Sequence, residues 1–287
     1  MAPSDVAATD GWVPWRRRAE TLRERHPFAE EVLTLYLALL DVWEEAWNAA
    51  REAPPEPAAL AEWAAGRVLP QVVEATGRAG PEPLADATHK LVEEGMASEP
   101  LVAWLTGGEL DPVERYLARA SLRGPLEAIG EGAAAACAAD PAPRGGRRCP
   151  RCGGPPQLSF RPRSEDGLVT ERRRLVCARC GAGWSYSGSS CASCGEAVGS
   201  RRVIYAERSE QPVVGRGDAT ASTQDGAPVF PHLRIEGCER CKRYLIDVDL
   251  GRDTRAVPEV DELSALPLDL YAAERGLTKI TPNLMGF

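Results

Sequence analysis

The sequence predicts an α+β protein in which an N-terminal all-helical domain, residues 1–140, is followed by two small four-cysteine metal modules. Three observations predict this fold class. Apolar residues recur at helical spacing in the first half of the chain, the apolar period changes to two after a stretch rich in Pro and Gly, and eight of the nine cysteines form Cys-x-x-Cys pairs. With 287 residues, of which 44% are apolar, the chain can bury the cores that such domains need.

The helical domain is predicted from apolar periodicity and from breaks between segments. Apolar side chains follow one helical face from Phe28 to Trp43, with acidic side chains between them. Asp111 and Pro112 indicate a helix start, because Asp can accept a backbone N–H as N-cap and Pro needs no donor in the first turn. His26 and His89 stand alone and are assigned no chemistry. Helices are expected over residues 28–50, 58–76, 83–94, 99–105 and 112–121.

The domain boundary is expected in residues 138–148, which have no apolar periodicity and contain two Pro next to two Gly, as in a linker. Beyond it, short strands replace helices, because apolar residues alternate. We place one module at residues 141–188 and the other at 189–287, the latter ending in a helical tail. The alternating positions are Leu158 with Phe160, Val203 with Tyr205, and Leu233 with Ile235.

The cysteine pairs predict two metal ions, each held by four thiolates. Two thiolates two residues apart can bind one ion from a tight turn, and two such turns complete a tetrahedral site for zinc or iron. Three pairs are followed directly by Gly, which suits a turn with positive φ. Only His232 lies beyond the linker, so the ligand set is all cysteine. The predicted metal ligands are Cys149, Cys152, Cys177, Cys180, Cys191, Cys194, Cys238 and Cys241.

Pairing in sequence order assigns the first four of these cysteines to one ion and the last four to the other. The first site then spans a hairpin of residues 158–160 and 174–176 that turns at residues 165–167. The second site has a longer connection, with an excursion expected at about residues 215–226. An interleaved pairing, first with third and second with fourth, stays open.

Two other interpretations of the cysteine pairs fit the sequence less well. Thioredoxin-like redox catalysis needs a strand that leads into a helix and does not call for four pairs. Disulfides are typical of exported proteins, and the first 18 residues lack a basic segment followed by an apolar run. Cys137 is left over and is interpreted as a small buried apolar residue. Trp184, Tyr186 and Tyr244 follow cysteine pairs and are expected to pack in the cores of the modules.

The charge pattern argues against nucleic-acid binding. The net charge is −8, with 12 basic and 24 acidic side chains in residues 1–140 and 22 and 18 in the remainder. A local arginine cluster is expected either to be solvated or to dock on the protein's own acidic helical half or on an acidic partner. No apolar stretch reaches a membrane-spanning length, so we expect a cytoplasmic protein without membrane insertion. The cluster comprises Arg147, Arg148, Arg151, Arg172, Arg173, Arg174 and Arg179.

The cysteine modules and the C-terminal tail together resemble the formate dehydrogenase accessory protein FdhE family. The resemblance covers most of the chain, and Ser185 departs from the His that the family often carries after the Trp. It implies rubredoxin-like modules that contain iron, a cytoplasmic protein needed for active molybdenum- or tungsten-containing formate dehydrogenase, and contact with the catalytic subunit of that enzyme. The residues that carry it are 149–153, 175–180 with Trp184, 191–194, 238–245, 256–258, 261–263, 266–270 and 282–286.

Three functions are carried forward. The first is a non-catalytic accessory or assembly factor for formate dehydrogenase, which the resemblance implies. The second is a redox protein that transfers electrons or exchanges thiols with the same client, because a four-cysteine iron can carry an electron. The third is a zinc-ribbon protein that binds nucleic acid, which the arginine cluster motivates. No phosphate-binding Gly loop or catalytic triad is present in the sequence, so no enzyme is predicted.

Overall fold

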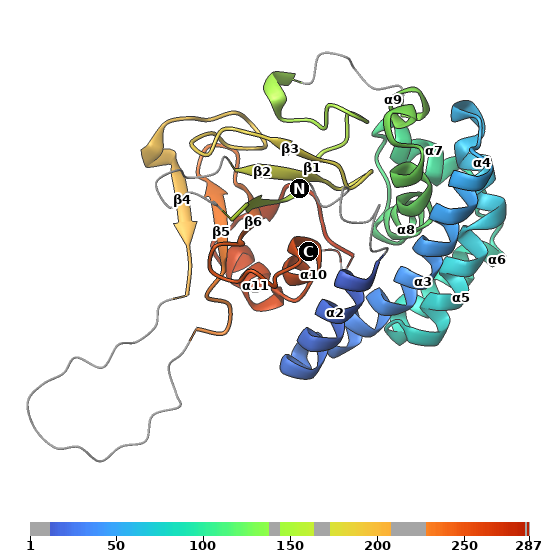
Figure 1. The fold of residues 1–287 in the computed structure, drawn as a ribbon, viewed down its shortest axis with the longest axis horizontal. Helices are drawn as coiled ribbons and strands as arrows, with labels where there is room; N and C mark the ends of the chain where they lie inside the picture. The colour runs from blue at the N-terminus through green and yellow to red at the C-terminus, as the bar shows by residue number, and fades with distance from the viewer. Residues whose placement is uncertain (1–11, 138–143, 164–172, 208–227, 285, 287) are drawn as a thin grey trace, which may run out of the picture.

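The computed structural model describes residues 12–137, 144–163, 173–207, 228–284 and 286. The predicted hairpin turn at 165–167, the excursion at 215–226, Arg172 and much of the predicted linker lie outside these residues. Figure 1 shows the two halves side by side: the N-terminal helices form one group, and the strands form the other together with the last two helices.

The helical half follows the predicted pattern with four differences. The structure contains α2 (Val13–Arg25), α3 (Glu30–Glu52), α4 (Leu60–Arg67), α5 (Leu69–Ala79), α6 (Glu82–Glu93), α7 (Glu99–Thr106), α8 (Pro112–Ala128) and α9 (Ala133–Ala136). Helices α2 and α9 were not predicted. The predicted helix 58–76 is wrong as a single helix, and the helix predicted to end at residue 121 continues to Ala128.

The first of the last two differences has a local cause, and the second has a cause in tertiary packing. Pro70 lies in the first turn of α5, where its ring and missing N–H prevent α4 from continuing, so the chain breaks at Val68. Helix α8 passes Gly124 because this residue packs directly on α3: a Cβ at Gly124 would lie 2.6 Å from the carbonyl oxygen of Trp43. The predicted start of α8 is confirmed, since Asp111 and Glu114 form a capping box.

The strands of both predicted modules belong to one sheet. They are β1 (Pro156–Arg161), β2 (Arg174–Cys177), β3 (Gly183–Ser185), β4 (Arg202–Tyr205), β5 (Leu233–Cys238), β6 (Arg243–Asp249) and β7 (Thr278–Lys279). Their order is β3-β2-β1-β6-β5-β4, and β7 also pairs with β6. Strands β1 and β2 are antiparallel, as predicted, whereas β1 and β6 pair in parallel and so join the two modules.

The C-terminal tail packs against both the sheet and the helical half. Helices α10 (Pro258–Leu263) and α11 (Leu266–Glu274) pack next to the sheet, and α10 also contacts α2 and α3 of the helical half. Buried Arg18 of α2 donates to buried Asp261 of α10, with Nε 3.0 Å from Oδ2, and to Asp253 at 2.9 Å. A buried pair of this kind fixes the two halves in one arrangement, because leaving either charge unpaired is costly.

The buried apolar residues fall into two clusters. One extends from the helices into the first module and includes Leu175, Trp184 and the first four paired cysteines. The other lies under the sheet and α11 and includes Phe160, Ile235 and Tyr244. Trp184 and Tyr244 are buried, which confirms their predicted role in packing. The first cysteine module therefore shares its core with the helical half.

Candidate metal centres

All four cysteine pairs adopt the same tight turn. In each turn the residue after the second cysteine donates its N–H to the carbonyl of the first, at 2.8–3.1 Å. That residue has positive φ in every case: 67° at Gly153, 68° at Gly181, 79° at Gly195 and 53° at Lys242. The expectation that Gly provides this conformation is confirmed for three turns. Lys242 adopts it in the fourth at a steric cost, because a side chain disfavours the left-handed region.

The turns bring the eight predicted sulfur atoms together in two groups of four, in sequence order. Within each group all sulfurs lie within 4.8 Å of one another. In the first group Cys149 lies 3.7 Å from Cys180, and in the second Cys191 lies 3.8 Å from Cys241. A tetrahedron with metal–sulfur bonds of about 2.3 Å has edges of about 3.8 Å. The spacing therefore fits a four-thiolate metal ion, and the interleaved pairing is not the one observed.

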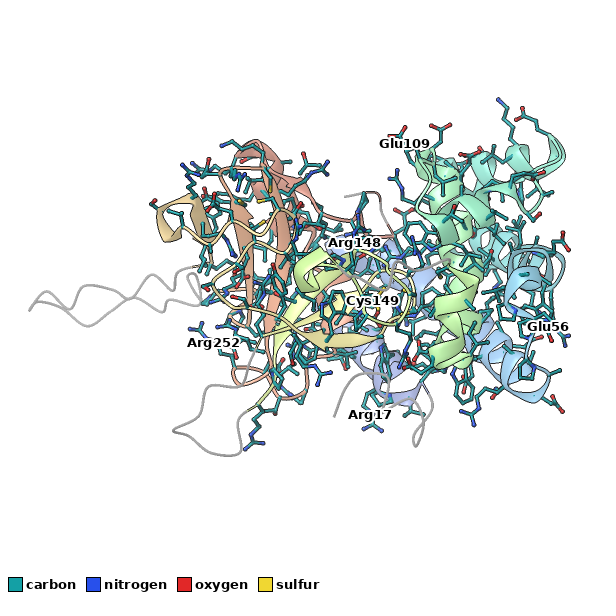
Figure 2. The ribbon with its side chains drawn as sticks, turned by 90° about the horizontal axis from the view of Figure 1, so that it is seen from above. Arg17, Glu56, Glu109, Arg148, Cys149 and Arg252 are labelled. Carbon is teal, nitrogen blue, oxygen red and sulfur yellow. The ribbon has the colours of Figure 1, made fainter. Side chains whose placement is uncertain are left out.

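The first group, site 1, lies between the two halves of the protein. Its four cysteines are buried, and Figure 2 shows Cys149 between the helices and the sheet. Arg179, within its second pair, donates to the carbonyl of Cys152 at 3.0 Å and stacks over Trp104 of α7, 5.7 Å from the ring centroid. Four thiolates around a divalent ion carry a net charge of −2, which the neighbouring guanidinium offsets.

A second arginine reaches site 1 from α8. The guanidinium of Arg123 lies against Gly181, and Nη1 of the same guanidinium donates to Glu259 at 2.7 Å. Acidic neighbours, chiefly Glu259, raise the pKa of Arg123 against the opposing effect of burial. Arg123 therefore stays charged while it links site 1, α8 and α10.

The second group, site 2, lies closer to solvent. Cys194 and Cys241 are half-buried, whereas Cys191 and Cys238 are buried. Burial raises the pKa of Cys241 to about 12, whereas the pKa of Cys194 is lowered because backbone N–H donation, led by Glu196, outweighs burial. A cation bound here must displace the proton of Cys241, so its affinity falls as the pH falls.

Of the arginines in the cluster that the structure describes, two are buried and four are half-buried, so the cluster does not form a fully solvated face. Arg173 and Arg179 are buried, and Arg173 pairs with Glu236 of β5 at 3.2 Å. Arg151 reaches Glu131 of the helical half at 3.4 Å, as the docking alternative predicted. Arg147 donates to the carbonyl of Ser193, within the third cysteine pair. These arginines connect the modules and the helices within one molecule.

Sequence reasoning did not find the surroundings of Cys137. This residue is buried, as expected, but it lies beside Cys152 and Arg179, so it borders site 1. The position of Arg123 was also missed. Neither residue has a local motif that points to site 1, since both come from the helical half.

Three comparisons place the chain among known proteins. The family model "FdhE, C-terminal domain" matches residues 219–285. A "Protein FdhE homolog" of Aquifex aeolicus is 30% identical over 139 residues, which is 48% of this chain and 41% of that protein. A second, of Pseudomonas aeruginosa, is 31% identical over 138 residues, which is 48% of this chain and 38% of that protein. The matched part thus spans about two fifths of the length of these relatives.

A solved structure extends the likeness to the fold of the whole chain. The crystal structure of the FdhE protein from Pseudomonas aeruginosa superposes with a TM-score of 0.56 at 22% identity, covering 95% of this chain and 94% of that one. Among the helices that the structure describes, none is both long enough and apolar enough to cross a membrane. The C-terminal domain match and the relatives make the chain similar to FdhE proteins, and the solved structure shows that it shares their fold.

Proposed function

We propose that this protein is a non-catalytic accessory factor required for active formate dehydrogenase, and that it binds the catalytic subunit of that enzyme. Similarity to FdhE proteins, over the C-terminal domain and about half of the chain, supports the proposal. We further propose that the eight paired cysteines hold two metal ions. The sulfur spacing supports this, and iron and zinc both suit four thiolates.

The two sites have different roles in this proposal. Site 1 is buried in the core that the helices share with the first module, so its ion stabilises the fold. Site 2 presents two half-buried cysteines near the sheet edge formed by β4, which lies far from the helices in Figure 1. Exposed Val198 and Ile204 lie in the same part of the module. Site 2 is therefore the better candidate for contact with the client.

Affinity purification from the native organism tests the proposed partner. Tagged protein expressed at its natural level should recover the formate dehydrogenase catalytic subunit, and deletion of the gene should abolish formate oxidation. The Ile204→Asp variant should fold, because Ile204 is 57% exposed, and it should recover less of the subunit. Recovery of no formate dehydrogenase subunit, together with normal formate oxidation in the deletion strain, would refute the proposal.

The solvent-near position of site 2 favours one second candidate, a redox protein acting on the same client. An iron ion at site 2 would lie close enough to the surface to exchange electrons. Zinc-substituted protein separates the two functions, since zinc has no redox chemistry. Full activation of formate dehydrogenase by the zinc form would exclude electron transfer. Two of the arginines that motivate nucleic-acid binding, Arg173 and Arg179, are buried and cannot contact phosphates.

A further inference from the structure

A cleft lies where α2 meets the end of the sheet and the segment leading into α10, and no cysteine of either site lines it. Its volume is about 890 Å³, which is within the range of ligand-binding pockets, and such pockets often form between domains. One wall is the face of α2 that carries Val13 and Arg17. The other includes Leu250 and residues 254–259.

The polar groups in the floor of the cleft are already used within the protein. Glu259 accepts from Arg123 and from Nε1 of Trp15 at 3.3 Å, and Arg18 is held by Asp261 and Asp253. The rest of the lining, apart from Thr21, Thr254 and the arginines of the rim, is apolar and includes buried Phe160. A site for a small polar ligand would offer free donors or acceptors at its base. This cleft instead offers apolar surface, which suits an apolar side chain.

The rim of the cleft is positively charged on both walls. Arg17 is exposed and projects from α2 at the edge of the molecule in Figure 2, and its guanidinium has no ion pair with any residue that the structure describes. On the opposite wall Arg255 is exposed and lies 3.7 Å from Asp253, which is also paired with Arg18. Exposed pairs at this distance contribute little, so both guanidiniums can bind an external carboxylate.

We infer that the cleft binds an extended peptide segment of a partner protein, with an apolar side chain on the floor and acidic side chains next to Arg17 and Arg255. The apolar floor contributes affinity by burial, and the charged rim selects acidic sequences over basic ones. That the partner is formate dehydrogenase rests on the proposed function, whereas peptide binding by the cleft does not.

Selection from a displayed library of random linear peptides tests the inference with the full-length protein. Wild type should enrich peptides in which Asp or Glu flanks an apolar residue. The double variant Arg17→Glu/Arg255→Glu should lose this enrichment. Arg78→Glu, a charge reversal at an exposed position on α5 outside the cleft, should keep it. No acidic enrichment by wild type, or equal enrichment by the double variant, overturns the inference.

Fluorescence anisotropy with one enriched peptide then measures how much the charged rim and the apolar surface each contribute to the binding affinity. The double charge reversal should weaken binding about tenfold or more, and added salt should weaken binding to wild type. Val13→Ser removes apolar surface at a position that is 53% exposed, so it should lower the affinity without unfolding the protein. An affinity unchanged in both variants contradicts the assignment.

Two further outcomes separate this inference from the proposed function. If the double variant still recovers formate dehydrogenase at the wild-type level and binds the peptides normally, the cleft assignment fails while the proposed function stands. If the peptides bind at the cleft but no formate dehydrogenase subunit is ever recovered, the proposed function fails and the cleft stands. A dimer in sedimentation that the double charge reversal dissociates would show a second copy as the occupant and overturn the peptide assignment.

Discussion

The guanidinium of Arg123 occupies the space that a side chain at Gly181 would need. Nη2 of Arg123 lies 2.5 Å from the position of a Cβ at Gly181, and Gly181 has a φ of 68° in the turn of the second cysteine pair. Arg123 comes from α8 and Gly181 from the first module. The packing of the helical half against site 1 therefore requires that residue 181 has no side chain.

Gly181→Ala should destabilise the protein by about 2 kcal/mol, because it combines left-handed strain with displacement of Arg123 from Glu259. Gly195→Ala is the matched control. It has the same kind of φ, 79°, but its Cβ would meet Arg147 at an ordinary distance of 3.7 Å, so strain alone should cost about 1 kcal/mol. Urea unfolding measures both values. Equal costs would show that the contact with Arg123 contributes nothing.

Metal release should occur in two phases. Site 1 is buried on all sides by the helices and the sheet, whereas site 2 has two half-buried cysteines, so a chromogenic chelator should remove the ion at site 2 first. Cys241→Ser should remove the fast phase and Cys149→Ser the slow one, with a larger loss of stability in the second variant. Cys137→Ala serves as the cysteine control and should retain both phases. A single phase for wild type would contradict the distinction between the sites.

Arg18→Ala should lower the free energy of unfolding by about 3 kcal/mol, because it leaves the buried carboxylate of Asp261 without its guanidinium partner. Arg16 on the same helix pairs with Asp41 and Glu44 at a more exposed position, so Arg16→Ala should cost less than about 1 kcal/mol. Thermal and denaturant unfolding can compare the two variants. A similar small cost for both would mean that the Arg18 pair does not hold the halves together.

His26 should make the protein less stable in mild acid. Its pKa is lowered, chiefly by burial beside Phe230 and also by Arg25 and Arg18, so folding favours the neutral ring. The unfolded state then binds more protons, and stability falls as the pH drops through the window below about 6.5. Melting curves of metal-loaded protein between about pH 7.5 and about pH 5.5 should show a smaller decline for His26→Asn than for wild type. Identical declines would contradict the prediction.

The cysteine sites were predictable because their chemistry is local. A Cys-x-x-Cys pair followed by Gly specifies a turn through its own backbone, and three of the four turns carry that Gly. Strands such as β1 and β5 were likewise predictable from alternation of Leu158 with Phe160 and of Leu233 with Ile235. The predicted boundaries at residues 140 and 188 remain predictions.

What the sequence did not predict depends on contacts between distant segments. Helix α2 has few apolar residues, and one of its buried positions is Arg18, whose charge is paired with the distant Asp253 and Asp261. The sequence alone did not indicate that members of the arginine cluster are buried. Burial of Arg173 depends on its ion pair with Glu236, which is more than sixty residues away in the sequence. The parallel pairing of β1 with β6, which merges the modules into one sheet, leaves no local signal either.

Native mass spectrometry of protein purified from its own organism without chelators can count the metal ions that the eight paired cysteines hold. We expect two bound metal ions per chain, and one per chain in Cys241→Ser. A chain without metal whose eight paired cysteines are free thiols or disulfides in the folded protein would contradict this expectation.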